Sequence, residues 1–289
     1  MIGFVAFPLV VAVAAALLSR RALDRLAPAP AARWNAALLV AVLVAAVPTF
    51  WILALSGLAH FGVRNSLCDW SAHLLPEHPL FGGLIGGGAL IVSVIGAVRM
   101  ARVMVTHWRI RCTERCDVQL IETPDVFAYT LPGPGRTIAV SRGLRQSLDD
   151  PEFAFVMAHE HAHARHRHDR YLLLGLIVAA AVPFMKAADL QLRFHLERWA
   201  DEEAVVTTGT NRKVAARTIA KVALAQPRSP ALLAIASHGI AARAGALMQP
   251  PPVASLNRRL QTVAAVLVTV ALSLSQVHHT AEFALRTML

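Results

Sequence analysis

The sequence predicts a mainly α-helical integral membrane protein with three N-terminal transmembrane helices, a small α+β domain and one C-terminal transmembrane helix. The first observation is composition: the 289-residue chain is 56% hydrophobic and 16% charged, with a mean hydropathy of +0.51. Soluble domains carry about 25% charged residues. The second observation is that long apolar runs alternate with arginine-rich loops. The net charge of +10 comes from arginine far more than lysine, as expected of basic residues that flank spans on the cytoplasmic side. Without a basic recognition helix we expect no nucleic-acid partner.

The three N-terminal spans are apolar runs at residues 2–18, 36–59 and 80–98. Each is close to the ~20 residues that a membrane-crossing helix requires. Arginines follow the first run instead of preceding it, which is typical of a retained span and not of a secretory signal. Arginine is frequent in residues 20–33 and 99–115 but rare in residues 60–79. We therefore expect the N-terminus outside, and a membrane domain at 1–116 that leads into the cytoplasm.

Small residues and cysteines say little about assembly. Residues 83–87 contain a G-x-x-x-G pattern inside a glycine-rich run, which leaves a homodimer open but is weak evidence for one. Cys68, Cys112 and Cys116 are too few for a disulfide framework, and the spacing of the last two is best explained by chance.

A domain at residues 117–255 follows the third span. The β-like segments 125–131 and 137–141 flank Pro132-Gly133-Pro134-Gly135-Arg136, a pattern typical of a β-hairpin. A helix is expected next, with Asp150 as the N-cap and Pro151 at the first helical position.

The motif that carries the chemistry lies in this helix. His159-Glu160-His161-Ala162-His163 reads H-E-x-x-H, and residues four apart share one helix face. His159 and His163 can therefore bind one zinc ion, and Glu160 can act as general base for a water molecule that zinc activates.

A second helix at residues 187–207 offers a third ligand. Glu197 and Asp201 are four apart, so Glu197 can coordinate the metal while Asp201 accepts the outer N–H of a ligating histidine. Glu202 and Glu203 are alternative third ligands, but neither has an aspartate four residues later.

Two further apolar runs complete the chain. Residues 171–185 are short for a span, and a single crossing would separate the second helix from the motif, so we expect a buried or partly membrane-inserted segment. Residues 256–277 read as a fourth span, within a C-terminal unit at 256–289.

The H-E-x-x-H motif and the later Glu197-Arg198-Trp199-Ala200-Asp201, after three spans and a His168-Asp169 pair, resemble the gluzincin membrane metallopeptidases of the BlaR/MecR family. HtpX-like peptidases share both motifs. The resemblance implies a zincin-like α+β metallopeptidase domain that binds one Zn²⁺ and hydrolyses peptide bonds. The short tail after the last predicted span leaves no room for a penicillin-binding sensor, which argues against β-lactam sensing.

The resemblance also implies two further site elements. An edge strand, either 137–141 or 126–131, would hold the substrate as an added strand, although an ordinary structural hairpin is an equal alternative. A basic residue after the third ligand would stabilise the oxyanion. Arg243 matches this position loosely, Arg259 is its rival, and a solvated arginine stays an open alternative.

The remaining histidines near the motif are expected to lie outside it. We interpret His161, His166 and His168 as solvated or lipid-interface residues, and His195 as pointing to another face than Glu197. For His166, which is seven residues from His159, a place on the metal face one turn further on is the alternative.

The expected function is an integral-membrane zinc metalloendopeptidase of the cell membrane, with its active site at the cytoplasmic face. Its substrate would be a cytosolic regulator of the repressor type or a membrane protein. The alternatives are a catalytically silent membrane sensor or scaffold that keeps the peptidase fold, and an HtpX-like quality-control protease. Few charged residues interrupt the spans, which disfavours a channel or transporter.

Overall fold

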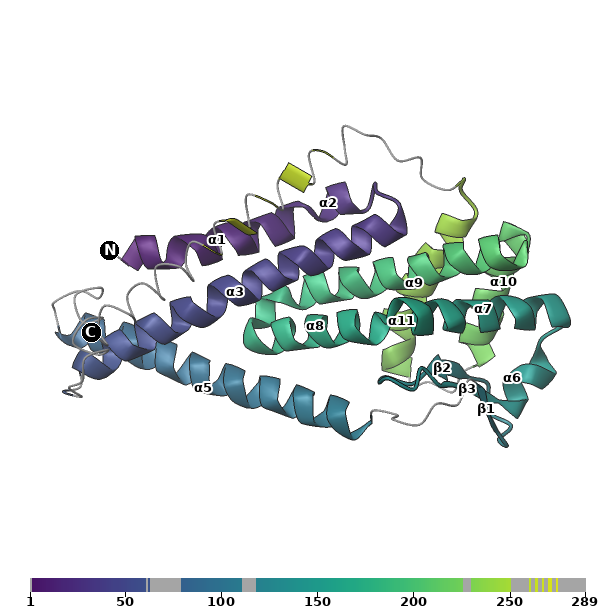
Figure 1. The fold of residues 1–289 in the computed structure, drawn as a ribbon, viewed down its shortest axis with the longest axis horizontal. Coiled ribbons are helices and arrows are strands. Elements are labelled where there is room, and N and C mark those ends of the chain that lie inside the picture. Colours follow the sequence, from purple (N-terminus) through teal and green to yellow (C-terminus); the bar gives the residue numbers. More distant parts are fainter. Residues whose placement is uncertain are drawn as a thin grey trace.

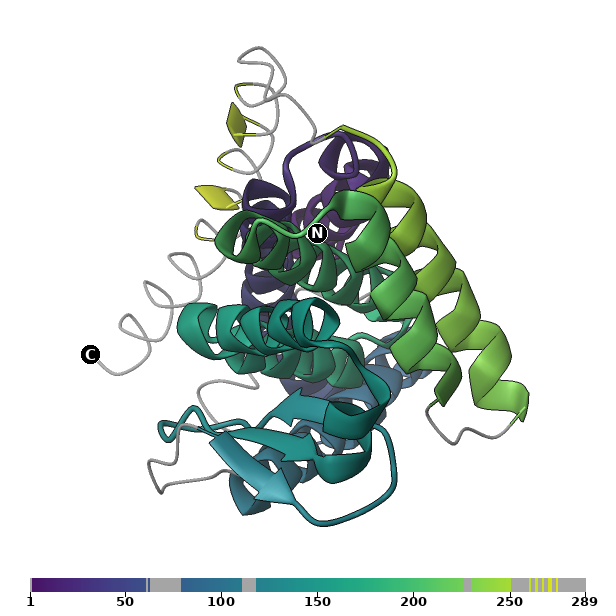
Figure 2. The same cartoon turned by 90° about the vertical axis from the view of Figure 1, so that its right-hand side faces the viewer.

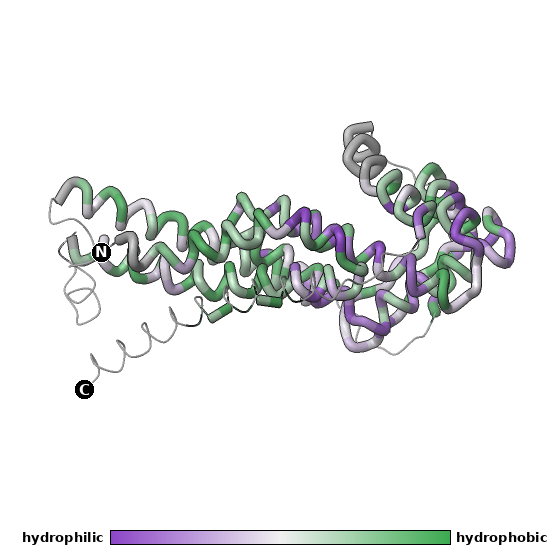
Figure 3. The backbone as a smooth tube through the Cα atoms, turned by 90° about the horizontal axis from the view of Figure 1, so that it is seen from above, coloured by the Kyte–Doolittle hydropathy of each residue, from purple (hydrophilic) through white to green (hydrophobic). Residues whose placement is uncertain are grey.

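The computed structural model describes residues 2–60, 62, 79–110, 118–225 and 230–250, with isolated positions between 260 and 274. Long helices form an elongated bundle at one end of the molecule, and a globular unit with a small sheet lies at the other (Figure 1). Apolar residues follow the long helices, whereas hydrophilic residues gather at the globular end (Figure 3). All three cysteines lie outside the described residues.

Two helices in the described part of the chain, α3 and α5, are long and apolar enough to cross a membrane. Helix α1 is shorter, and the short α2 links it to α3. The predicted first span coincides with α1, and the second and third lie inside α3 and α5. The predicted fourth span lies largely outside the described residues and stays a prediction. The bounds are Ile2–Leu18 for α1, Arg20–Leu23 for α2, Pro28–His60 for α3 and Pro79–Arg109 for α5.

Helices α3 and α5 cross at a pair of glycines. A Cβ atom at either Gly57 or Gly86 would overlap the backbone of the other residue, so only glycine permits this approach. Along most of its length α5 exposes large apolar side chains, as expected of a helix that faces lipid. These include Phe81, Leu84, Ile91, Val94, Ile95 and Val98.

The sheet has three strands, β1 (Val118–Ile121), β2 (Ala128–Thr130) and β3 (Ile138–Ser141), in the order β1-β3-β2. The antiparallel pair of β2 and β3 confirms the predicted hairpin. Strand β1, parallel to β3, was not predicted, because a four-residue segment with mostly exposed side chains carries little local signal. Of the two segments offered as the edge strand, 137–141 is excluded because β3 pairs on both sides, whereas 126–131 contains β2, which lies at an edge of the sheet.

Helix α7 (Asp150–His166) follows the sheet and the short α6 (Arg142–Ser147). Its N-cap is Asp149 and not Asp150 as predicted. Asp149 accepts a hydrogen bond of 2.8 Å from the Glu152 amide, and the Glu152 carboxylate accepts one of 3.2 Å from the Asp149 amide. This reciprocal capping box explains the shift by one residue, because Asp149 has its Glu at the third helical position.

Helices α8 (His168–Ala181) and α9 (Lys186–Thr208) form a hairpin that turns at the 3₁₀ segment η2 (Pro183–Met185). The hairpin packs against α3 and α5, and its buried residues share one core with α3. The chain therefore reverses direction after residues 171–185, as expected of a segment that does not cross the membrane completely. The predicted second helix, 187–207, matches α9, which ends at Gly209 in a left-handed conformation.

Two further helices, α10 (Arg212–Ala225) and α11 (Pro230–Leu247), complete the globular unit. Seen along the molecule, the sheet lies on one side of α7 and the α10–α11 pair on another (Figure 2). Buried Phe155, Ala204, Ile219 and Leu247 join these helices in one apolar cluster. The helix that bears the motif is thus fixed from several directions.

Candidate metal centre

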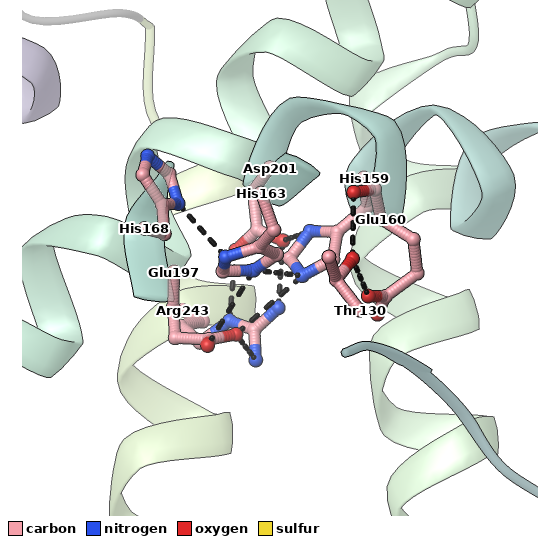
Figure 4. Close-up of polar contacts among 8 residues, drawn as sticks. All are labelled: Thr130, His159, Glu160, His163, His168, Glu197, Asp201 and Arg243. Carbon is pink, nitrogen blue, oxygen red and sulfur yellow. Dashed lines mark hydrogen bonds and ion pairs between the residues drawn. The ribbon is translucent and has the colours of Figure 1, made fainter. Parts of the chain in front are cut away.

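Three predicted ligands converge between α7 and α9. His159 and His163 lie one turn apart on α7, with their Nε2 atoms 3.0 Å from each other. Glu197 of α9 places Oε2 3.5 Å from His159 Nε2 and Oε1 3.6 Å from His163 Nε2. Figure 4 shows the three side chains pointing toward one another. Two imidazole lone pairs this close repel unless a positive charge lies between them, so the group fits a cation.

Asp201 lies behind the first histidine. Its Oδ1 is 2.9 Å from His159 Nδ1, and its side chain is buried. A carboxylate at this place favours a proton on Nδ1, which leaves the Nε2 lone pair directed toward His163 and Glu197. Burial alone would lower the pKa of His159, but the contacts with Asp201 and Glu197 raise it to about 10. A proton and a metal ion therefore compete for this histidine.

His168 lies behind the second histidine, with its Nδ1 2.8 Å from His163 Nδ1. It is fully buried, so the expectation of a solvated or lipid-interface residue is wrong. Arg167, at a φ of 55°, ends α7 in a left-handed conformation and turns the first residue of α8 back under the motif. Burial, followed by repulsion from His163, lowers the pKa of His168 to about 2. A neutral His168 can accept the Nδ1 proton of His163.

Arg243 reaches the same carboxylates from α11. Its Nη1 is 2.8 Å from Glu197 Oε2, and its Nε and Nη2 donate to Asp201 at 2.8 and 2.7 Å. Burial would raise the pKa of Glu197, but Arg243 and then His163 hold it well below its usual range. The predicted residue is therefore at the site. Its rival, Arg259, lies outside the described residues.

The charges of the centre match a divalent cation. Glu160, Glu197 and Asp201 contribute three negative charges, and Arg243 contributes one positive charge. The net charge of these four side chains is therefore −2. Both histidines can be neutral when they act as ligands. The donor set of two imidazoles and one carboxylate is typical of catalytic zinc sites.

The base, Glu160, is held by the edge strand. Thr130 Oγ1 on β2 is 2.9 Å from Glu160 Oε2 and 2.9 Å from the Glu160 carbonyl oxygen. The Glu160 carboxylate is thus fixed beside the ligand histidines (Figure 4). The sequence reasoning missed Thr130, and only its place in the hairpin before the helix hinted at this contact.

The alternative third ligands have other partners. Glu202 accepts two hydrogen bonds from Arg212, at 2.6 and 2.8 Å. Glu203 lies 2.6 Å from Nε2 of His166 and 3.0 Å from Arg165. His166 was expected to be solvated, but it is half-buried and in hydrogen-bond contact with Glu203. Glu197 is the carboxylate that reaches the histidines.

His161 and His195 match their predictions. His161 is exposed and bonds Met157 O, and His195 faces Asp24 on the side of α9 away from the ligands.

A cavity of about 530 Å³ opens at the centre. Its walls come from β2, from helices α7 to α11 and from the end of α5. Glu160, His159, His163, Glu197 and Arg243 all line it. A ligand in this cavity would contact the metal ligands and the edge strand together.

Residues 98–266, more than half of the chain, match peptidase family M48. The chain belongs to peptidase family M48. The matched region contains the whole metal centre, and M48 peptidases are zinc-dependent metalloproteases. Zinc is therefore the cation that the family implies for the two histidines and Glu197.

One curated relative of this M48 chain is described as a "Protease HtpX homolog" from Thermoplasma acidophilum. The two are 47% identical over 58 residues, which is 20% of this chain and 18% of the relative. The chain thus matches less than a fifth of the relative's length. With the two apolar helices, this similarity indicates a membrane-type M48 metallopeptidase. No solved structure matches the chain.

Proposed function

We propose that this M48 chain is an integral-membrane zinc metalloendopeptidase. The observation that carries the proposal is the convergence of His159, His163 and Glu197 in a cavity, with Glu160 held beside them by the edge strand. The ligands would fix the ion. When bound, zinc would supply the Lewis acid that polarises the scissile carbonyl and acidifies a water molecule.

The protein's own groups would handle the proton. Glu160 would take it from the attacking water and deliver it to the leaving amine. Thr130 would keep the Glu160 carboxylate in position between these two steps. Asp201 and His168 would hold the tautomers in which both ligand histidines present Nε2.

Arg243 would have two tasks. It orients Glu197 and Asp201 through the three contacts described above. These contacts leave two of its five N–H donors for other partners. We propose that these two donate to the oxyanion that forms on the substrate carbonyl.

We place the site at the cytoplasmic face of a multi-pass protein whose N-terminus is outside. Support comes from the arginine-rich residues 20–33 and 99–109, which lie at the ends of α3 and α5 nearest the globular unit. The Arg33 guanidinium carbon lies 4.9 Å from the ring centroid of Trp199 on α9, the helix that contains Glu197. A reporter fused after residue 115 should be cytoplasmic, and an external signal would overturn this topology.

The substrate would be a cytosolic regulator or a membrane protein. A repressor-type regulator would fit the BlaR/MecR resemblance, whereas the HtpX-homologue match favours a quality-control role. The test is a comparison of newly formed protein N-termini in cells that express the wild type or Glu160→Ala. N-termini that appear only with the wild type would support proteolysis and name the substrates. Coincident profiles would refute proteolysis through this site.

A further inference from the structure

The cavity extends along α8 beyond the metal centre. One wall there consists of Leu172, Leu173 and Leu176 of α8, with His107 and Ile110 at the end of α5. We name these five residues the α5–α8 arm. The two helices approach closely where Gly96 meets Ala181 and diverge toward the globular unit (Figure 1). The arm is therefore a largely apolar recess continuous with the metal centre, and Arg193 of α9 also lines the cavity.

The arm has uncovered apolar surface. Leu176 is 40% exposed and Ile110 is 55% exposed. Both line the same cavity, so their exposed surface is a shared patch and not that of isolated surface residues. Burying such side chains against another apolar group is favourable. The arm and the metal centre share one cavity. The occupant that the structure suggests is therefore part of the same substrate that reaches the metal centre.

Strand β2 sets the direction in which a substrate would lie. Ala128, at the start of β2, belongs to the same apolar cluster as Phe153 and Val156 in the first half of α7. After β2, the Gly133 amide donates to Asp169 at the start of α8, at 3.3 Å. Strand β2 therefore runs from the beginning of α7 toward α8.

The outer edge of β2 is open in the described part of the chain. Leu131 N donates to Thr137 O and Ser141 N donates to Phe127 O, so the odd-numbered residues bond β3. In an antiparallel pair the alternate residues, Ala128 and Thr130, direct their amides and carbonyls outward. An antiparallel strand added there runs opposite to β2, so its N-terminal residues lie beside α8.

We propose that the α5–α8 arm binds a large apolar side chain of the substrate on the N-terminal side of the scissile bond. This inference rests on the proposed peptidase function. Leu172 follows His163 by nine residues, across the end of α7 and the start of α8, and even a straight helix of that length spans only roughly four residues of an extended strand. The selected side chain thus lies among the first six or so residues before the cut. One well-buried side chain gives roughly a 10- to 100-fold preference in kcat/KM.

The test uses the purified full-length protein with zinc and a library of peptides randomised around the cleavage site, with products sequenced by mass spectrometry. The wild type should favour Leu, Ile, Met or Phe at one position N-terminal to the cut. Leu176→Lys should lose this preference by about 10-fold or more and favour Asp or Glu instead. Leu190→Lys is the matched control, because Leu190 is 49% exposed on the same helical hairpin but does not line the cavity, and it should keep the wild-type profile.

The outcomes separate the two proposals. If the wild type cuts no peptide that Glu160→Gln leaves intact, the proposed function fails and the arm falls with it. If cleavage depends on Glu160 but no apolar preference appears before the cut, or it appears only after the cut, the arm alone is refuted. The wild-type profile decides this even if Leu176→Lys does not fold. In that event Leu173→Trp, which fills the recess, should shift the same position toward small residues, and an unchanged profile would refute the arm.

Discussion

Arg243 donates two hydrogen bonds to Asp201, from Nε to Oδ2 at 2.8 Å and from Nη2 to Oδ1 at 2.7 Å. The guanidinium thus joins α11 to the carboxylate that lies behind His159, and it also contacts Glu197. Removing Arg243 would leave both carboxylates close together without their cation, and Asp201 is nearly fully buried.

We therefore expect Arg243→Ala to cost about 3–5 kcal/mol of unfolding free energy, because the buried Asp201 carboxylate would lose both hydrogen bonds from the guanidinium and keep only its contact with His159. Zinc affinity should fall by roughly 10-fold or more, since Glu197 and His159 would lose their orientation. Chemical denaturation and competition with a zinc chelator measure the two effects. Arg142→Ala, which breaks an exposed ion pair with Glu122, should cost no more than about 1 kcal/mol. Equal behaviour of the two variants would contradict the role of Arg243.

His168 is expected to control zinc affinity without binding zinc. His168→Leu cannot accept the Nδ1 proton of His163, so zinc affinity should fall by roughly 10- to 100-fold. His168→Gln keeps an acceptor and should restore part of this loss. Chelator competition is the measurement, with His161→Ala as the control, because His161 is an exposed histidine on the same helix. Wild-type affinity in His168→Leu would refute the contact's importance.

Thr130 is expected to act on the rate and not on metal binding. Thr130→Val removes the hydroxyl beside the Glu160 carboxylate at nearly constant volume, so kcat should fall by roughly 10-fold while zinc content stays at one per chain. Thr130→Ser keeps the hydroxyl and should stay near the wild type. A loss of zinc in Thr130→Val, or equal rates in all three proteins, would show that Thr130 does not position the base.

Thr130 and His168 mark the part of the site that the sequence did not predict. The motif spacing predicted His159, Glu160 and His163, and the second helix predicted Glu197 and Asp201, because residues four apart on a helix share a face. Thr130 and His168 could not be predicted in this way. Their contacts depend on how β2 docks on α7 and on the left-handed turn at Arg167, which are tertiary features.

For the fold, too, local features could be predicted from the sequence and tertiary features could not. The long apolar helices and the hairpin turn between 131 and 137 could be predicted from the sequence, because apolar runs and turn residues are local signals. Strand β1 could not be, since its side chains are mostly exposed and only its parallel partner β3 defines it. The strand order, and with it the edge strand, follows from that pairing.

His195 should make the protein sensitive to acid. It is fully buried, and burial lowers its pKa to about 4, although Asp24 opposes part of this shift and Arg198 adds to it. The unfolded state takes up a proton near pH 6.5, before the folded state does, so stability falls as the pH drops from about 6.5 toward 4. His195→Asn should remove roughly 1–3 kcal/mol of this pH-dependent loss.

Thermal unfolding between pH 4 and 8 measures the effect of His195. His161→Asn is the control, because an exposed histidine should leave the wild-type slope unchanged. An equally steep slope in His195→Asn would assign the acid sensitivity to other groups.

The central claim is that His159, His163 and Glu197 hold a zinc ion with which Glu160 hydrolyses peptide bonds. The most direct measurement combines zinc content and peptide cleavage for purified wild type and Glu160→Gln. We predict one zinc per chain in both proteins and cleavage by the wild type alone, with a loss of roughly 100-fold or more in the variant. A wild type without zinc, or equal cleavage by both proteins, would contradict the claim.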